Sequence, residues 1–543
     1  MPRSRRLVTS LGDLAAGVVV LAALLLPDRL TRTDWGSFAA LPIEFVLGAA
    51  VLLVVPARVR RPLAATFGLV LGSLTLLKII DIAFYGALAR PFDLVLDWSL
   101  FPGGWALLAA SLGLPLATTV VAAAGLLTAA VLVGVPWAVL RLGRILDGQR
   151  TGAVAALVVL GAAWLTCASA GVRAIPPYPV AADASTTKIV AEIGGVRAGL
   201  LDQERFATEV AVDRFRDVPA DQLLASLRGT RVVVIFVESY GRVALDDPQI
   251  SPEVIELLDT GTASLAAVGL RARSGYLTSP TAGGGSWLAH ATLQSGLWID
   301  NQQRYRNLMA TDRLTLTRAF ADAGWHTLAV MPGTTTAWPD GAFYGYQDIY
   351  DAAALGYAGP DFGWARVPDQ YTLAQTDRLT SAVDGRPPSM AVVPLVSSHA
   401  PWTPVPAMVD RAQLGNGSSI APAAGPAEPP EAILTRDRSR VRTDYRRSLV
   451  YSLDSVVSYL QRPRTDDLLV IMVGDHQPSP VVTGPDAGTE VPISIVSNNP
   501  DLLARTDGWG WTDGLRPSAD APVWPMDQVR DRVLTVFTPE RHR

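Results

Sequence analysis

The chain of 543 residues contains one cysteine, two lysines and five histidines. Its single cysteine, Cys167, excludes an intramolecular disulfide and a cysteine-rich metal site. Because the only lysines are Lys78 and Lys188, nearly all of the positive charge comes from arginine. The 46 Lys and Arg residues are outnumbered by 50 Asp and Glu residues, which gives a formal net charge of -4. The chain therefore has no broad basic field, and we expect no nucleic-acid partner.

Apolar residues, in contrast, are abundant, and they concentrate in roughly the first third of the chain. A helix that spans a membrane needs about 20 apolar residues. The segments that qualify are 11–26, 39–55, 63–84, 105–133 and 153–170. The fourth apolar run continues toward residue 140 and contains Pro115 and Pro136, so a sixth crossing stays open. We expect residues 1–172 to form a transmembrane domain of about five helices.

Arginine clusters give the topology of these helices. They precede the first segment, follow the second and precede the fifth: Arg3, Arg5, Arg6; Arg58, Arg60, Arg61; Arg141, Arg144, Arg150. Positively charged loops stay in the cytoplasm, so the amino terminus lies inside and the chain after residue 170 lies outside. The first segment lacks a small-residue cleavage pattern and is expected to remain as an anchor. The prediction is a multi-pass cell-membrane protein with an extracytoplasmic carboxy-terminal domain.

The third apolar segment contains two charged residues, Lys78 and Asp81, on one helical face. Each alone would be costly in hydrocarbon. Arg90 follows just outside the segment, together with Asp93 and Asp97. Two interpretations remain open: a self-neutralising pair near the interface, or a polar site of Lys78, Asp81 and Arg90 that presents a lipid headgroup to the outer domain.

Residues 173–228 form the predicted linker. It begins with the proline-rich stretch AIPPYPV, which should leave the bilayer as a stiff extended segment. Residues 196–215 then mix apolar and charged positions at helical spacing, as in a packed connector helix or a helix on the membrane surface. Residues 229–543 form the predicted catalytic domain, in which 412–432, rich in Gly, Ser, Pro and Ala, is expected to be a disordered insertion.

Short apolar runs typical of buried strands recur through the last part of the chain, at 232–237, 327–330, 390–396, 468–473 and 493–496. Helical patterns lie between them, for example at 314–323 and 445–460. This alternation predicts a doubly wound α/β sheet, whose functional residues lie at the carboxyl ends of the strands. Glu238, His399, Asp475 and His476 follow three of the predicted strands. Carboxylate oxygen and imidazole nitrogen suit one divalent ion, Mn²⁺, Zn²⁺ or Mg²⁺.

A candidate nucleophile, Ser286, follows the glycine run Gly283–Gly285 and opens a helical pattern that ends at Gly296. The start of a helix favours an anion, although a serine there is also an ordinary N-cap. Beside a metal ion the hydroxyl would be activated for attack on a phosphate or sulfate ester, giving a covalent phosphoserine. Ser279 and Thr281 are alternative nucleophiles nearby.

Four motifs in this order resemble the alkaline phosphatase superfamily, in its sulfatase-like branch, and most closely membrane enzymes of the lipoteichoic acid synthase type. The motifs are VVVIFVESYGR, GGGSWLAHATLQSGL, SSHAPW and VGDHQP. The resemblance implies that Glu238, Ser286, Asp475 and His476 hold one divalent ion and that Ser286 is the nucleophile. It also implies that His399 hydrogen-bonds the transferred group or the leaving oxygen.

The chain departs from these families at three places. Lipoteichoic acid synthases use a threonine nucleophile in place of Ser286, and a Trp and an Arg where this chain has Tyr344 and Tyr346. Sulfatases that form formylglycine need Pro and Arg where this chain has Leu288 and His290. Further candidates for the substrate pocket are Asp340, Tyr344, Tyr346 and, one turn after Ser286, His290.

The predicted function is a membrane-anchored, metal-dependent transferase. It would move a phospho-alcohol group, similar to phosphoglycerol or phosphoethanolamine, from a lipid donor through Ser286 to a cell-envelope glycan or lipid. Two alternatives stay open: a metal-dependent phosphodiesterase, phosphatase or sulfuric ester hydrolase, and a non-catalytic envelope-binding protein.

Overall fold

The computed structural model describes residues 3–29, 38–88, 90–94, 96–101, 104–105, 108–109, 113–175, 178–362, 366–381, 387–423, 436–484 and 487–539. The chain divides into two compact units. The first comprises Met1–Trp105 and Gly113–Asp202, and the second Ala106–Leu112 and Gln203–Arg543. The division falls inside helix α7 (Ala184–Ala211), whereas the sequence predicted a linker up to residue 228. The second unit starts earlier because Phe206 and Phe215 are buried in its hydrophobic clusters.

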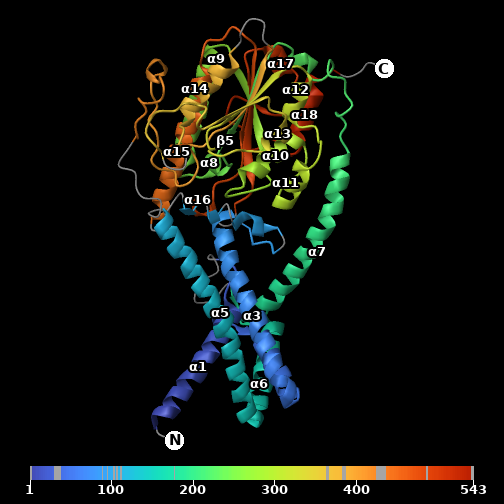
Figure 1. Cartoon of the computed structure of the whole chain (residues 1–543), viewed down its shortest axis with the longest axis vertical. Coiled ribbons are helices and arrows are strands. Elements are labelled where there is room, and N and C mark those ends of the chain that lie inside the picture. Colours follow the sequence, from blue (N-terminus) through green and yellow to red (C-terminus); the bar gives the residue numbers. More distant parts are fainter. Residues whose placement is uncertain are drawn as a thin grey trace. The chain divides into compact units, whose positions relative to one another are not determined.

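The first unit is helical (Figure 1). Its main helices are α1 (Arg3–Leu25), α2 (Ile43–Val54), α3 (Ala57–Leu88), α5 (Leu114–Gly148) and α6 (Arg150–Ala170). Two short pairs of strands accompany them: β1 (Leu41–Pro42) with β4 (Ala181–Ala182), and β2 (Arg173–Ile175) with β3 (Tyr178–Pro179). Helices α3 and α5 approach closely, since a Cβ on Gly68 would lie only 2.4 Å from the Cα of Pro136.

Three of these helices, α3, α5 and α6, are long and apolar enough to cross a membrane, and the apolar parts of α1 and α2 are shorter. Large apolar side chains are exposed along α5 and α6, as expected for surfaces that face lipid. The protein is therefore a membrane protein, and the number of five crossings stays a prediction. The bounds predicted for the fourth segment, 105–133, are wrong. Helix α5 begins after Gly113 with Pro115 in its first turn, a position that proline tolerates, and it continues through Pro136 to Gly148.

The charged residues of α3 do not pair with each other. Lys78 Nζ donates to the carbonyl oxygen of Leu24 at 2.9 Å and to Ser185 Oγ at 3.2 Å. Asp81 Oδ2 instead pairs with Lys188 Nζ at 2.5 Å. The predicted self-neutralising pair is wrong because the partners come from α1 and α7, which no local spacing predicts.

Arg90, the third member of the predicted headgroup site, forms two hydrogen bonds to the carboxylate of Asp97, at 2.6 and 2.7 Å. All three side chains of that site are thus engaged within the protein. A lipid-headgroup site stays a prediction and receives no support from these contacts.

The second unit is built on a nine-stranded sheet of order β12-β6-β11-β10-β5-β9-β7-β8, with β13 beside β6. The strands are β5 (Arg231–Val237), β6 (Arg271–Thr278), β7 (His326–Met331), β8 (Asp348–Asp351), β9 (Ser389–Pro394), β10 (Leu468–Gly474), β11 (Glu490–Ser497), β12 (Thr512–Asp513) and β13 (Val523–Pro525). Strands β10, β5, β9, β7 and β8 are parallel, and β11 runs antiparallel to both β10 and β6.

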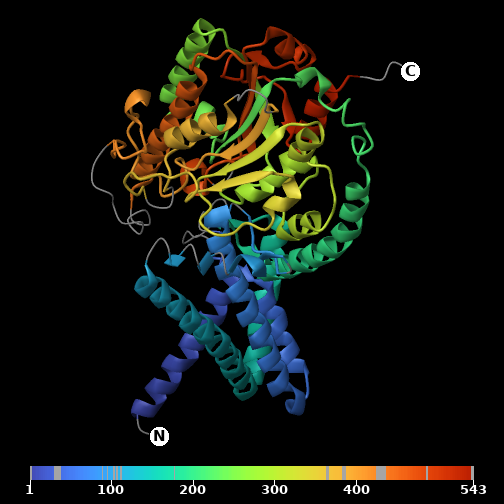
Figure 2. The ribbon, with the colours of Figure 1, turned by 45° about the horizontal axis from the view of Figure 1, so that its top comes forward.

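Helices cover both faces of this sheet (Figures 1 and 2). On one face lie α9 (Ser251–Ala267), α14 (Asp369–Thr380) and α15 (Arg438–Leu460), and on the other α10 (Ser286–Ser295), α12 (Leu316–Asp322) and α18 (Gln528–Phe537). Shorter helices complete the unit: α8 (Val243–Asp246), α11 (Gln302–Met309), α13 (Gly341–Tyr344), α16 (Pro480–Thr483) and α17 (Pro500–Ala504). The central strands are fully buried, as their apolar runs predicted. The doubly wound α/β fold is confirmed.

The predicted disordered insertion, 412–432, is corrected in part. Residues 424–432 lie outside the described residues. In the described part, Leu414 and Ile420 are buried in the core cluster that also contains Tyr371. A prediction based on composition missed these two residues because most of the residues around them are small or polar.

Candidate active site

Four elements of the second unit bring the predicted site residues to one edge of the sheet. Glu238 directly follows β5, and Asp475 and His476 directly follow β10. His399 lies in the loop after β9, and Ser286 is the first residue of α10. Because β10, β5 and β9 are parallel neighbours, their carboxyl ends meet at the same edge.

Three side chains at this edge form a buried cluster. Ligand atoms of Glu238, Asp475 and His476 all lie within 4.8 Å of one another. The Nε2 atom of His476 is 3.5 Å from Glu238 Oε1 and 3.6 Å from Asp475 Oδ2. The other ring nitrogen, Nδ1, lies 2.8 Å from the carbonyl oxygen of Gln477, which can only accept a hydrogen bond from Nδ1–H. With Nδ1 engaged by the backbone, Nε2 is the ring nitrogen of His476 that faces the two carboxylates.

Backbone and hydroxyl groups hold the carboxylates in place. Asp475 Oδ1 accepts hydrogen bonds from the backbone N–H groups of Ser239 (2.8 Å) and His476 (2.7 Å). The hydroxyl of Ser239 donates to Glu238 Oε1 at 2.7 Å. Ser239 has a left-handed backbone, with φ of 53°, and the hydroxyl of Tyr445 donates to its carbonyl oxygen at 2.8 Å. This strained turn after β5 is the kind of conformation that folded proteins keep at functional sites.

The electrostatics of the cluster favour a cation. Burial and, after it, the neighbouring charge of Glu238 together raise the pKa of Asp475 to about 7. Burial also acts to raise the pKa of Glu238, but His476 and His399 outweigh it and lower the pKa. Two carboxylates, one imidazole and an adjacent hydroxyl are a donor set that fits a divalent ion such as Zn²⁺ or Mn²⁺. Glu238, Asp475 and His476 are thus the residues that fit a metal ion.

Ser286 is the hydroxyl that touches this cluster. Its Oγ lies 3.1 Å from Glu238 Oε2 and 3.1 Å from His476 Nε2. The two alternative nucleophiles are engaged elsewhere: Ser279 Oγ donates to the carbonyl oxygen of Asp475, and Thr281 Oγ1 to that of Gly284. Each residue of Gly283–Gly285 has positive φ, which lets the chain turn sharply into α10 and places Ser286 at its first position.

The loop that carries His399 is tied to the same edge. Ser398 Oγ donates to the carbonyl oxygen of Glu238 at 2.6 Å. The buried carboxylate of Asp369 accepts from the backbone N–H groups of Val396 (2.8 Å) and Ser397 (3.0 Å). The sequence analysis missed Asp369, because the only signal was an acidic residue after Pro368 at the start of a helix.

A cavity of about 330 Å³ opens beside Ser286. Its lining includes Ser286, His290, Tyr344, Tyr346 and His399, all of which were predicted as site residues. Asp340, also predicted, does not line the cavity. It accepts a hydrogen bond at 3.0 Å from the hydroxyl of Tyr305, which does line the cavity and was not predicted from the sequence. Among the described residues that line the cavity there is no lysine or arginine, and aromatic side chains form much of its wall: Phe236, Trp287, Tyr305, Trp338, Tyr344 and Tyr346.

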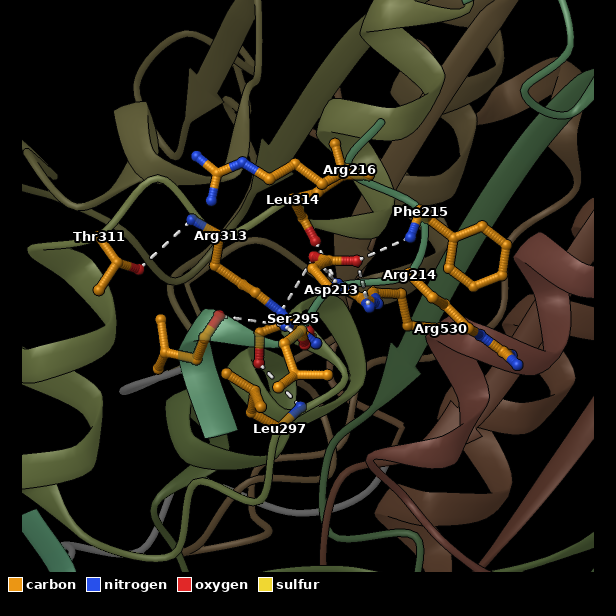
Figure 3. Close-up of polar contacts among 12 residues, drawn as sticks. Asp213, Arg214, Phe215, Arg216, Ser295, Leu297, Thr311, Arg313, Leu314 and Arg530 are labelled. Atoms are coloured by element: carbon orange, nitrogen blue, oxygen red, sulfur yellow. Dashed lines mark hydrogen bonds and ion pairs between the residues drawn. The ribbon is translucent and has the colours of Figure 1, made fainter. Parts of the chain in front are cut away.

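A buried ionic cluster secures the far end of the helix that carries Ser286 (Figure 3). Arg530 of α18 is fully buried and holds Asp213 with two hydrogen bonds of 2.9 and 3.1 Å. Arg313 Nε lies 3.3 Å from the same carboxylate and donates to the carbonyl oxygen of Ser295, the last residue of α10, at 3.0 Å. The cluster connects α10 to α18 and to the segment after α7, and so holds α10 in place.

The second unit was compared with known protein families. Residues 231–500 match the family model described as Sulfatase. No curated protein matches the chain.

A search of solved structures finds matches that include three proteins. Lipooligosaccharide phosphoethanolamine transferase A from Neisseria meningitidis has 14% identity and a TM-score of 0.48, with 96% of this chain and 95% of that chain covered. The lipoteichoic acid synthase LtaP from Listeria monocytogenes has 11% identity and a TM-score of 0.36, with 59% and 75% covered. Phosphoglycerol transferase GacH from Streptococcus pyogenes, in complex with sn-glycerol-1-phosphate, has 14% identity and a TM-score of 0.35, with 62% and 90% covered.

Proposed function

We propose that this chain transfers a phospho-alcohol group from a membrane lipid to a cell-envelope acceptor. The match of residues 231–500 to the family model described as Sulfatase supports an enzyme of the sulfatase-like type. The observation that carries the proposal is the position of Ser286. Its hydroxyl lies 3.1 Å from both a carboxylate and an imidazole, at the start of a helix and beside a cavity.

Each residue of the cluster has a part in this proposal. Glu238, Asp475 and His476 would hold a divalent ion, with the hydroxyl of Ser286 beside it. A bound ion there would lower the pKa of the hydroxyl and stabilise negative charge on the phosphoryl oxygens. Glu238 orients the hydroxyl by accepting its hydrogen bond. The amino terminus of α10 favours the anionic substrate at the same point.

The proposed reaction has two displacements at phosphorus. In the first, Ser286 Oγ forms a bond to phosphorus, the bond from phosphorus to the diacylglycerol oxygen breaks, and diacylglycerol leaves with the proton. In the second, an acceptor hydroxyl attacks the resulting phosphodiester, the bond to Ser286 Oγ breaks, and the serine regains a proton. His399 lines the same cavity, and in this proposal it hydrogen-bonds the transferred group or the leaving oxygen.

The cavity lining restricts the substrate. With no lysine or arginine among its described lining residues, the cavity suits an alcohol that carries no negative charge of its own. Phosphoglycerol and phosphoethanolamine groups both meet this condition. The apolar helices of the first unit support a lipid donor, and the predicted topology, with the carboxy-terminal domain outside the cell, supports an envelope acceptor.

The test uses the full-length protein, loaded with Mn²⁺ or Zn²⁺, and vesicles of phosphatidylglycerol or phosphatidylethanolamine labelled in the headgroup. We expect diacylglycerol to be released and the label to move to an added glycan or lipid acceptor. Ser286→Ala should abolish release, whereas Thr260→Ala, which removes an exposed hydroxyl on α9, should not change it.

Release of label only to water would favour a phosphodiesterase over a transferase. Undiminished diacylglycerol release by Ser286→Ala would exclude the proposed nucleophile. Hydrolysis of sulfate esters with no reaction on any phospholipid would refute the proposal in favour of a sulfatase.

A further inference from the structure

His290 is a polar residue of the cavity with an unused hydrogen-bonding atom. It lies one helical turn after Ser286 on α10, and its ring packs against Phe236 with centroids 4.0 Å apart. His290 lines the cavity beside Ser286. Its Nε2 atom is buried and has no hydrogen-bond partner among the described residues.

An unpaired polar atom of this kind is costly to a folded protein. Buried polar groups nearly always find a partner, and each exception needs an explanation. A phenylalanine would pack on Phe236 equally well without carrying an unpaired nitrogen. Packing alone therefore does not explain why a histidine stands at this position.

The protonation state of the His290 imidazole limits which groups it can bind. Burial, opposed by the charge of Glu238 and reinforced by His476, lowers the pKa of His290 to about 4. The imidazole is thus neutral near pH 7, with one N–H donor and one lone pair. A neutral donor can approach an anion in the cavity without pairing with Glu238 and Asp475, which a lysine or arginine at this position would do.

We infer that His290 binds the substrate directly, by donating a hydrogen bond from Nε2–H to a non-bridging phosphoryl oxygen of the group attacked by Ser286. A phosphodiester offers only acceptors on its phosphoryl oxygens, which matches a donor at Nε2. The inference rests on the proposed function, because it needs a phosphoryl group next to Ser286. It gives His290 a role in holding the group through both displacements.

The test compares His290→Phe and His290→Gln with the wild-type chain in full-length protein loaded with metal. Phenylalanine keeps the ring contact with Phe236 and removes the nitrogen, whereas glutamine keeps a side-chain donor. We expect His290→Phe to slow diacylglycerol release about 10- to 100-fold, as for loss of one hydrogen bond to an anion. His290→Gln should recover part of that loss.

Two further readouts separate substrate binding from a structural role. The thermal midpoint of His290→Phe should equal or exceed that of the wild type, because the unpaired atom is gone. Its bound metal should be unchanged. A control, His326→Phe, replaces a histidine that pairs with Asp348 away from the cavity and should leave the rate unchanged.

Several results would overturn the inference. A wild-type rate in His290→Phe would show that Nε2 does not act on the substrate. Loss of bound metal in His290→Phe would make His290 a ligand, and a lowered midpoint without rescue by glutamine would make it structural. No reaction of the wild type with any phospholipid would instead overturn the proposed function, and the inference with it.

Discussion

Replacing Asp369 by alanine should slow the reaction without altering any residue that lines the cavity. The Asp369 carboxylate is fully buried between α14 and the loop that carries His399. It accepts from the backbone N–H groups of Val396 and Ser397, and from the hydroxyl of Ser452 at 2.6 Å. We therefore propose that Asp369 positions the loop that carries His399.

The size of the effect follows from those contacts. Asp369→Ala leaves two buried N–H groups without an acceptor, at about 1–3 kcal/mol each, so the loop should lose about 2–6 kcal/mol of stability. Asp369→Asn keeps one oxygen for both N–H groups, and the Ser452 hydroxyl can turn to accept from the new amide. Burial raises the pKa of Asp369, so the charge itself is not favoured there, and the asparagine variant should be close to the wild type.

The assay is a double-mutant cycle on diacylglycerol release, with thermal unfolding of each variant as a control. His399→Ala alone should cost about 10²–10⁴-fold, the usual contribution of one positioned acid or base. If Asp369 acts through His399, Asp369→Ala should reduce the rate of diacylglycerol release by a smaller factor than His399→Ala does. In a chain that already carries His399→Ala, adding Asp369→Ala should reduce the rate almost no further. Losses that multiply in the double variant would refute this reasoning, and so would wild-type activity in Asp369→Ala.

Three further predictions concern neighbouring positions. Asp475→Asn should reduce bound metal from stoichiometric to near zero by elemental analysis, while the metal-free variant unfolds at the same or a higher temperature, because burial already disfavours this carboxylate. Gly474→Ala would place a Cβ 1.9 Å from the carbonyl oxygen of Tyr240, so it should destabilise the domain by about 1–3 kcal/mol in thermal unfolding and weaken metal binding. The pKa of His290 is lowered from 6.5 to about 4, so the unfolded chain binds more protons between these values and the free energy of unfolding should rise with pH across that window. Urea unfolding should show a rise of up to about 3 kcal/mol from this group, which His290→Phe lacks.

The sequence alone located most of the cluster because its residues follow strands. Glu238 and Asp475 stand directly after apolar runs, and parallel strands end at one edge of a sheet. Ser286 was identifiable from the glycine run before it, since that run signals a sharp turn into a helix. These signals are local, and the fold then brings the residues that carry them close together at one edge of the sheet.

The residues that the sequence did not predict depend on contacts between distant segments. Asp369, on α14, contacts the loop after β9 only in the folded chain. Tyr305, on α11, likewise reaches the cavity only through the fold. The same limit applies to the membrane unit, where Lys78 and Asp81 suggested a pair by spacing but found partners on α7. A spacing of three or four residues reports which side chains share a helix face, and not which neighbour the fold brings to them.

The most direct test of the central claim is mass spectrometry of the protein, quenched in acid after incubation with phospholipid vesicles and no acceptor. The account predicts a phosphodiester adduct on Ser286, with a mass that identifies the transferred alcohol and with no such adduct in Ser286→Ala. An adduct on Ser279 or Thr281, or turnover without any adduct on residues 279–286, would contradict it.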